Sequence, residues 1–390
     1  MNILIANKFY YNRGGDCIAS IALEQLLKAK GHRVAFFSMQ HPQNFPSEWS
    51  EFFPSNVDFQ AGGISSKLKA AGRIFGAGEV RSRFLKLVDR FKPDVLHLNN
   101  IHSQLSPVIG ELAHQKGIKV VWTLHDYKLV CPNYICLKSG KPCEECLQRG
   151  AFPALRNRCM KGSLPARLLA FMESVYWNRE RLINNTDYFV APSSFMKQIM
   201  VRGGFPEAQV KVIPNFMNRD FSGKSETKSD YYCYVGRLSG EKGVQTLLDA
   251  AKELPYQLFI VGTGPLKDSL PDTCGHIRFL GFKEWNELKP IVSRARFVVV
   301  PSEWYENNPF SVIETHCLGT PVLGANIGGI PELIDTPTNG MLFEPGNKEE
   351  LKTKIETMYN ASFDYDNIST QAIRRFSAET YYDEIIKLYR

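Results

Sequence analysis

The chain has 390 residues, of which 44% are apolar and 22% are charged. This composition is that of a globular protein and excludes a disordered chain, a collagen-like fibre and a coiled coil, while the length predicts two or three domains. The net charge of +7 is unevenly distributed, because residues 1–215 contain 28 Lys and Arg against 16 Asp and Glu, whereas residues 216–390 contain 19 against 24. An anionic partner is therefore expected for the first half only.

The N-terminal residues lead directly into an apolar strand, without the basic and long apolar regions of a secretory signal. No apolar run approaches the roughly 18 residues of a membrane span, so we expect a cytoplasmic protein. Two basic stretches would fit a nucleic acid, an anionic membrane surface or a phosphate-bearing acceptor, or would simply form a solvated face. Their cations are Lys67, Lys69, Arg73, Arg81, Arg83, Lys86, Arg90 and Lys92, and then Arg149, Arg156, Arg158, Lys161 and Arg167.

In the first half, short apolar runs alternate with stretches of helical periodicity. This alternation predicts a parallel sheet with right-handed crossovers. The expected strands are 2–7, 33–38, 94–98, 119–124, 188–191 and 210–213, and the expected helices are 18–27, 107–115, 163–185 and 194–202.

Pro214 and Asn215 end this half, and the polar residues 218–230 follow before the alternation restarts. We therefore expect an α/β protein with two doubly wound, Rossmann-like domains, 1–215 and 216–370, facing each other across a cleft, and a helix within 371–390 that crosses back to the first domain. The expected strands are 232–235, 257–261, 277–280, 297–300 and 321–324, and the expected helices are 244–253, 285–294, 309–318, 347–359 and 369–389.

The densest group of polar and glycine residues lies at 301–332. Glu306 falls in the loop after a predicted strand, and Glu314 falls about one turn inside the next helix. The backbone of residues 308–311, which are Asn308, Pro309, Phe310 and Ser311, lies at the start of that helix, where the dipole and unpaired N–H groups favour a phosphate. A carboxylate one turn further can accept from ribose hydroxyls. The alternative is a loop charge and a solvent-facing helix residue.

A second group follows the first strand of the second half. Gly236 and Arg237 begin a glycine-punctuated loop that also contains Lys242. A guanidinium and an ammonium at the end of a parallel strand could neutralise a diphosphate leaving group without a metal. Two solvated cations on a surface loop are the alternative.

A third group is Gly14 and Gly15, between the first strand and helix. Two glycines let backbone approach a phosphate or sugar closely, or simply form a tight turn. The loop is not a GxGxxG fingerprint and no acidic residue ends the next strand, so NAD is disfavoured.

Taken together, these motifs resemble the retaining glycosyltransferases of family 4, which have the two-domain GT-B fold. The resemblance spans nearly the whole chain and also includes His125-Asp126, residues 212–215 and the turn that contains Gly264. It implies a nucleotide-diphosphate sugar as co-substrate, held mainly by the second domain, an acceptor held by the first, and retention of anomeric configuration. It implies no required cofactor and no nucleic-acid partner.

By position, the resemblance implies that Arg237 and Lys242 bind the diphosphate and that Glu306 binds hydroxyls of the donor sugar. Glu314 would bind the ribose, and His125 would touch the donor sugar. The remaining donor-binding positions would be Gly14, Gly15, Gly236, Gly264, Asn308, Pro309, Phe310 and Ser311. The chain departs from many members of the family at Asp16, at residues 307–311 and at Thr315. Because of these departures, the resemblance does not identify the donor sugar. After another predicted strand, the polar side chains either line the acceptor side or cap the turn; they are His97, Asn99, Asn100 and His102.

Five of the nine cysteines fall within residues 131–159, and two of them form a CxxC pair. Cys136, Cys143, Cys146 and Cys159 are a candidate set for a structural zinc ion, with Cys131 as the alternative to Cys136, since a reducing compartment disfavours disulfides. Buried free thiols are the alternative. The basic residues after Cys146 suggest that this insertion faces the acceptor.

We therefore expect a glycosyltransferase that acts on a glycan or lipid-linked acceptor, in surface polysaccharide or similar glycan assembly. It would be cytoplasmic and could be peripheral on the inner membrane face. A two-domain nucleotide-sugar binder without turnover and a sugar-nucleotide epimerase on the same fold are the alternatives.

Overall fold

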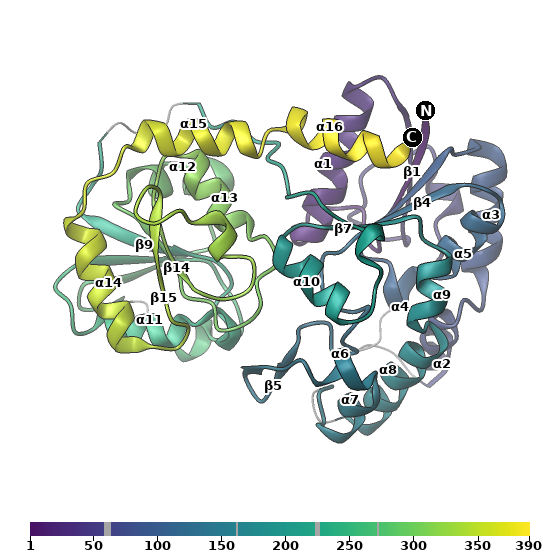
Figure 1. The fold of residues 1–390 in the computed structure, drawn as a ribbon, viewed down its shortest axis with the longest axis horizontal. Helices are drawn as coiled ribbons and strands as arrows, with labels where there is room; N and C mark the ends of the chain where they lie inside the picture. Colours follow the sequence, from purple (N-terminus) through teal and green to yellow (C-terminus); the bar gives the residue numbers. More distant parts are fainter. Residues whose placement is uncertain (58–63, 161–162, 223–226, 271–272) are drawn as a thin grey trace. The chain divides into compact units, whose positions relative to one another are not determined.

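The fold is described by a computed structural model, which covers residues 1–390 except 58–63, 161–162, 223–226 and 271–272. The chain forms two compact units (Figure 1). Unit 1 comprises residues 1–136, 143–214 and 381–390, and unit 2 comprises residues 137–142 and 215–380. Each is described separately below. None of the helices in the described part of the chain combines the length and apolar character that crossing a bilayer requires.

Unit 1 is built on a parallel six-stranded sheet in the order β2-β1-β3-β4-β7-β8. Helices cover both faces of the sheet (Figure 1), which explains why its strands read as nearly continuous apolar runs. The side chains of Ile3, Leu4 and Ile5 in the interior strand β1 are fully buried. The strands are β1 Asn2–Ala6, β2 Arg33–Phe37, β3 Val95–Leu98, β4 Lys119–Thr123, β7 Tyr188–Ala191 and β8 Val210–Val212.

The helices of unit 1 differ from the sequence prediction in several places. The first basic stretch forms two helices that were not predicted, and three short helices were not predicted either: His102–Leu105, Glu145–Arg149 and Phe152–Arg156. The predicted helix 163–185 is divided in two: the first part ends at Tyr176, and Asn178 caps the second by accepting a hydrogen bond from the Arg181 N–H. The helices are α1 Gly15–Ala29, α2 Ile64–Ile74, α3 Glu79–Phe91, α4 His102–Leu105, α5 Val108–Gln115, α6 Glu145–Arg149, α7 Phe152–Arg156, α8 Leu164–Tyr176, α9 Arg179–Asn184 and α10 Ser194–Arg202.

Unit 2 contains a seven-stranded sheet in the order β11-β12-β10-β9-β13-β14-β15, in which only the β11–β12 pair is antiparallel. Both sheets confirm the predicted α/β class with two doubly wound domains. The strands are β9 Tyr231–Val235, β10 Gln257–Val261, β11 Thr273–Cys274, β12 Ile277–Gly281, β13 Val298–Val300, β14 Val322–Ala325 and β15 Gly340–Phe343. The helices are α11 Val244–Ala251, α12 Trp285–Arg294, α13 Phe310–Cys317, α14 Lys348–Asn360 and α15 Tyr365–Arg375.

The predicted single helix 369–389 is two helices, α15 and α16 Ala378–Tyr389, and the second unit extends to residue 380 rather than 370. The break falls at Phe376, whose carbonyl accepts a hydrogen bond from the Met217 N–H at 2.9 Å and is therefore no longer available to a continuing helix. In unit 1, the Tyr389 hydroxyl of α16 contacts His97 Nδ1. The sequence predicts that the apolar positions of this C-terminal segment need a partner surface; of these, Phe376, Tyr381 and Ile385 are buried, whereas Ile373 is 44% exposed.

The remaining strands, β5 Leu137–Lys138 and β6 Lys141–Pro142, form a short antiparallel hairpin within the cysteine-rich insertion.

Candidate functional site

The strand order of unit 2 defines one place where a ligand is expected. From β9 the chain proceeds outward through β10 and β12 on one side, and it then returns to β13 and continues outward on the other side. In open α/β sheets, ligands bind at the carboxyl ends of the two strands where this direction reverses. The loops that follow β9 and β13 contain Arg237, Lys242 and Glu306, so three of the predicted residues lie at this switch point.

The loop after β9 is held in place by its glycines. Gly243 has φ +66° and lies so close to the β13 loop that an added Cβ would be 1.8 Å from the Pro301 carbonyl oxygen. At Gly264, in the loop after β10, a Cβ would be 2.4 Å from the Leu238 oxygen. These close approaches require glycine and fix the three neighbouring loops against one another. Gly264 therefore has a packing role beside its predicted place in the donor site.

Lys242 and Glu306 form the centre of the site. Lys242 Nζ lies 2.6 Å from Glu306 Oε1, which also accepts from Ser302 Oγ at 2.7 Å and from Trp304 Nε1 at 2.9 Å. The ammonium is 5.0 Å from the centroid of the Trp304 ring. Burial alone would raise the pKa of the Glu306 carboxyl, but the attraction of Lys242 and these hydrogen bonds hold the pKa below its ordinary value. The residue is therefore a carboxylate at neutral pH.

Gly328 and Gly329, in the loop after β14, pack against the backbone of Glu306. The Gly329 N–H donates to the Glu306 carbonyl at 2.7 Å. Gly328 has φ +63°, and a Cβ there would be 2.4 Å from the same carbonyl oxygen. The motif at residues 328–332 thus positions the backbone that carries the carboxylate.

The start of α13 is anchored by a pair of asparagines. Asn308 Oδ1 accepts from the Asn215 N–H at 3.0 Å, and Asn215 Nδ2 donates to the Asn308 carbonyl at 3.0 Å. The buried side chain of Asn308 therefore holds the segment that enters unit 2. Pro309 has no N–H, so the backbone donors predicted at this helix start are those of Asn308, Phe310 and Ser311.

Glu314 lies on α13 as predicted, but its carboxylate pairs with a residue that the sequence analysis did not select. Arg219 Nε is 2.9 Å from Glu314 Oε1, and its guanidinium is 4.5 Å from the centroid of the Trp285 ring. Burial raises the pKa of Glu314, and the attraction of Arg219 opposes that rise. The only sequence signal for Arg219 was its position in the polar segment after the domain boundary.

The contacts therefore join Lys242 to Glu306 and not the four predicted residues to one another. Arg237 is exposed on the same loop as Lys242, and its carbonyl accepts from the Tyr234 hydroxyl at 2.7 Å. Gly236 precedes it directly at the end of β9.

Unit 1 has its own switch point, between β1 and β3. Gly14 has φ −160°, an extended conformation that any residue can adopt, and Gly15 is the first residue of α1. The backbone conformation therefore does not require these glycines, and their predicted close approach to a phosphate or sugar stays a prediction. His125, which follows β4, has its Nε2 2.9 Å from Asn99 Oδ1, and burial lowers the pKa of its imidazole.

The polar residues predicted after β3 are held by hydrogen bonds within unit 1. His97 lies inside β3 rather than in the loop after it, and its buried ring contacts Thr123 Oγ1 of β4 at 2.8 Å. The backbone N–H of Asn100 donates to Asn7 Oδ1 at 3.1 Å. His102 Nε2 lies 3.2 Å from Asp126 Oδ1. Burial would raise the pKa of Asp126, but His102 and hydrogen bonds lower it to about 2.

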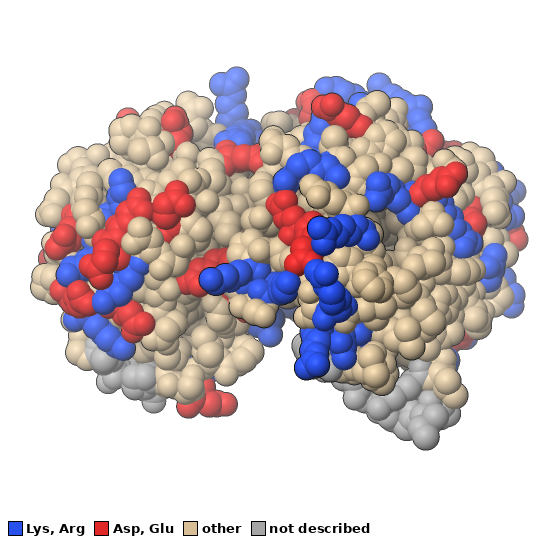
Figure 2. All heavy atoms as spheres, turned by 60° about the horizontal axis from the view of Figure 1, so that its bottom comes forward, with Lys and Arg blue, Asp and Glu red and all other residues tan. Residues whose placement is uncertain are grey.

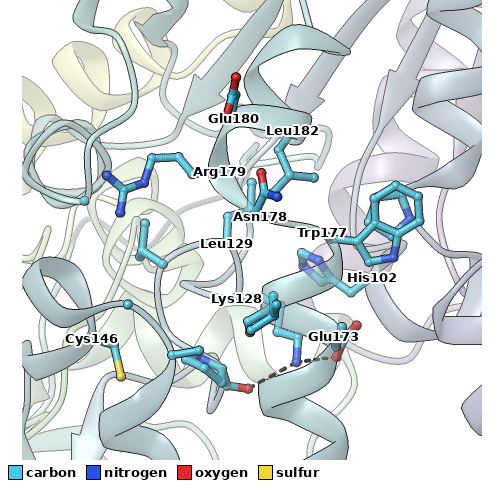
Figure 3. Close-up of a pocket in the computed structure, with 18 of the residues that line it drawn as sticks. His102, Lys128, Leu129, Cys146, Glu173, Trp177, Asn178, Arg179, Glu180 and Leu182 are labelled. Carbon is cyan, nitrogen blue, oxygen red and sulfur yellow. Dashed lines mark hydrogen bonds and ion pairs between the residues drawn. The ribbon is translucent and has the colours of Figure 1, made fainter.

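A pocket of about 700 Å³ lies beside these residues in unit 1 (Figure 3). His102 and Trp177 line it, and Lys128 Nζ on its wall is 2.8 Å from Glu173 Oε2 and 3.1 Å from the Pro132 carbonyl oxygen. Both charges of the Lys128–Glu173 pair are largely buried. The sequence analysis missed this pocket, because its walls come from segments that are far apart in the chain.

The candidate zinc set is not supported. Among the described residues, no three His, Cys, Asp or Glu side chains are arranged to hold a metal ion. Cys131, the alternative to Cys136 in that set, lies within hydrogen-bond distance of Cys136 and Cys146. The insertion forms two short helices whose acidic residues are paired: Glu144 makes a bidentate ion pair with Arg202, at 2.7 and 2.9 Å, and Glu145 pairs with Arg156 at 2.9 Å.

Comparisons with known proteins cover both units. Residues 21–221 match the family model described as glycosyltransferase family 4, and residues 216–375 match that of glycosyl transferases group 1. A 42.6 kDa protein encoded in the cps region of Klebsiella pneumoniae is 23% identical over 359 residues, which are 85% of this chain and 87% of that protein. An O-antigen biosynthesis glycosyltransferase of Escherichia coli is 32% identical over 155 residues, which are 38% of this chain and 43% of that protein.

Several other curated relatives are matched over only about half of their length, including an uncharacterised glycosyltransferase of Methanocaldococcus jannaschii and a sulfoquinovosyl transferase of Arabidopsis thaliana. Among solved structures, Anabaena HepE in complex with UDP-glucose superposes with a TM-score of 0.64 at 19% identity, over 99% of this chain and 98% of that one. The fold and the matches to the two family models agree. The chain belongs to glycosyltransferase family 4.

Proposed function

We propose that this protein transfers a sugar from a nucleoside diphosphate sugar to a glycan or lipid-linked acceptor with retention of anomeric configuration, in the assembly of a surface polysaccharide. The relatives encoded in a cps region and named for O-antigen biosynthesis support the role in polysaccharide assembly. The solved relative that carries UDP-glucose supports the donor class.

The Lys242–Glu306 pair at the switch point of unit 2 is the observation that carries this proposal. An ammonium has three N–H donors, and the contact with Glu306 Oε1 uses one of them. The other two can be directed at phosphate oxygens, and Arg237 on the same loop adds a planar, permanently charged donor. The three described contacts to Glu306 all fall on Oε1, which leaves Oε2 to accept from hydroxyls of the donor sugar.

In the proposed reaction, the bond between the anomeric carbon and the diphosphate oxygen breaks, and the acceptor oxygen bonds to that carbon. The proton of the acceptor hydroxyl passes to the departing phosphate, so no protein base is required. Lys242 and Arg237 stabilise the charge that grows on the leaving group. His125, whose pKa is lowered by burial, is neutral at pH 7 and can donate or accept a hydrogen bond at the sugar.

The acceptor is assigned to unit 1, whose pocket of about 700 Å³ combines apolar walls with the Lys128–Glu173 pair. Such a mixture suits a ligand that presents both apolar surface and hydroxyl groups.

Incubation of the protein with a panel of UDP-, GDP- and ADP-sugars tests the proposal. We expect slow release of one nucleoside diphosphate in the absence of acceptor, and no release by Lys242→Ala. Lys252→Ala, an exposed lysine paired with Asp249 in the same unit, is the matched control and should behave as the unchanged protein.

Two other outcomes identify the alternatives. Conversion of one sugar nucleotide into another would assign an epimerase, and binding without any turnover would assign a non-catalytic binder. Either result would overturn the proposed transfer.

A further inference from the structure

Helix α8 turns an apolar side toward solvent. Leu164, Leu168, Met172 and Val175 are 64%, 48%, 41% and 54% exposed. Their spacing of three and four residues places them in one row along the helix. A surface helix of a globular protein usually directs polar residues outward, but here the buried side of α8 contains the carboxylate of Glu173 instead. The helical periodicity of residues 163–185 predicts an apolar side that includes Leu168, Met172 and Val175, and the structure leaves these three side chains exposed.

The row continues onto neighbouring side chains. Tyr176, at the end of α8, is 39% exposed, and Phe152, on α7, is 63% exposed. The two helices are joined by Arg167 Nη1, which donates to the Leu155 carbonyl at 3.0 Å. Six of the thirteen large apolar side chains that are exposed in the described chain lie on these two helices. We call them the α7–α8 patch: Phe152, Leu164, Leu168, Met172, Val175 and Tyr176.

The charges near the patch are mostly positive. Residues 147–172 contain five Lys and Arg and no Asp or Glu. Of these five, Arg156 pairs with Glu145 at 2.9 Å, and Lys161 lies outside the described residues. Arg149 and Arg158 are exposed, and Arg167 donates to the backbone carbonyls of Ser163 and Leu155, so these contacts leave its charge uncompensated. In Figure 2, which brings the lower end of Figure 1 forward, blue Lys and Arg side chains border a broad uncharged area of this unit.

Aliphatic and aromatic side chains beside clustered cations are the two features that interfacial protein segments use on anionic lipid. We propose that the α7–α8 patch binds the surface of an anionic lipid bilayer, with the apolar row between the lipid headgroups and the arginines against the lipid phosphates. Binding at the surface requires no membrane-spanning helix. It also does not depend on the transfer reaction.

Val175 belongs both to this patch and to the lining of the pocket in unit 1. A lipid-linked acceptor held in the bilayer would therefore meet the pocket where the protein meets the membrane; this consequence alone rests on the proposed function.

Co-sedimentation of the full chain with lipid vesicles tests the proposal. Vesicles that contain about a third phosphatidylglycerol in phosphatidylcholine should bind the protein at least about tenfold more tightly than phosphatidylcholine alone. The variant Leu168→Glu/Met172→Glu should bind these vesicles at least about tenfold more weakly. Arg149→Ala and Arg158→Ala should each weaken binding about fivefold. The control is Phe282→Glu, which places the same charge at a 65% exposed apolar residue of unit 2 and should not change binding.

Circular dichroism shows whether the variants are folded, and exposed positions should tolerate the change. Absence of sedimentation with the anionic vesicles, or equal binding by Leu168→Glu/Met172→Glu, overturns the proposal. If the patch instead joins two copies of the chain, gel filtration will show a dimer that this double variant dissociates, without vesicle binding, and that result also overturns it. Release of nucleoside diphosphate without acceptor is measured separately, so failure of membrane binding is distinguishable from failure of the transfer reaction.

Discussion

In both units the chain runs outward in opposite directions from a pair of neighbouring parallel strands, β1 and β3 in unit 1 and β9 and β13 in unit 2. The loops after β9 and β13 meet in a charged cluster, Lys242 with Glu306. The loops after β1 and β3 meet through uncharged hydrogen bonds, such as the one from the Asn100 N–H to Asn7 Oδ1. In unit 1 the charged groups near the switch point, such as Lys8 and Asp16 at 3.6 Å, belong to one loop and its helix and do not join the two loops. The comparison teaches that the same topology can join its two switch-point loops by an ion pair or by neutral hydrogen bonds, and that the side chains decide which.

The largest expected effect concerns the charged cluster. Glu306→Gln replaces the carboxylate that faces Lys242 with a neutral amide, and we expect kcat to fall about 100- to 1,000-fold. Steady-state kinetics with the donor identified in the sugar-nucleotide panel measure this change. Glu287→Gln, at an exposed carboxylate of the same unit, should retain full activity. Activity of Glu306→Gln within a few-fold of the unchanged protein would remove Glu306 from the reaction.

A stability effect is expected for the buried ion pair of unit 1. Lys128→Met leaves the carboxylate of Glu173 in the pocket wall with Ser103 as its remaining described side-chain partner, and the free energy of unfolding should fall by about 3 kcal/mol. Urea denaturation measures this loss. The double variant Lys128→Met/Glu173→Leu removes both charges and should recover most of it. A single-variant loss below about 1 kcal/mol would indicate that the pair is effectively solvated.

The pH dependence of unit 1 should reflect Asp126. The pKa of this carboxyl is lowered from 3.8 to about 2 by its pairing with His102. Because the folded-state pKa lies below the unfolded one, Asp126 adds about 2 kcal/mol of stability above pH 4, and this contribution is lost as the pH falls toward 2. Asp126→Asn should therefore be less stable than the unchanged protein at pH 6 and approach it at pH 2. A constant difference across this range in urea denaturation would contradict the assignment.

The smallest effect is expected at Arg219, which lowers the pKa that burial raises at Glu314. Arg219→Ala should let that pKa rise further, so a larger fraction of Glu314 is protonated in mildly acidic solution. Donor affinity measured by calorimetry should be a few-fold weaker near pH 6 and nearly unchanged near pH 8. Arg278→Ala, at an exposed position of β12, is the control. A loss of affinity that is equal at both pH values would mean that Arg219 contacts the donor directly.

The residues at the centre of the candidate site in unit 2 could be predicted from the sequence because each motif lies within one short segment of the chain. Gly236, Arg237 and Lys242 lie within one loop, and residues 301–332 combine a strand end, a helix start and the Gly328–Gly329 pair. Parallel strands bring such ends to one edge of a sheet, so their order in the chain indicates their neighbourhood. The Lys242–Glu306 contact follows from the adjacency of β9 and β13.

The features that the sequence did not predict depend on contacts between residues far apart in the chain. The Lys128–Glu173 pair and the Asn215–Asn308 pair join residues 45 and 93 positions apart, and no periodicity connects them. The helix predicted over 163–185 had the correct apolar row but the wrong length and the wrong environment, because periodicity identifies a face and does not reveal whether another element covers it. Cysteine spacing suggested zinc, although it does not determine where the thiols point.

The position of α16 in the chain determines when unit 1 can complete its fold during translation. Residues 381–390 complete unit 1, where the Tyr389 hydroxyl reaches the buried ring of His97. All of unit 2 is synthesised before these residues are. During translation, the earlier residues of unit 1 therefore cannot complete their fold until unit 2 and α16 have been synthesised. Until then, the surface that α16 will cover stays accessible to chaperones.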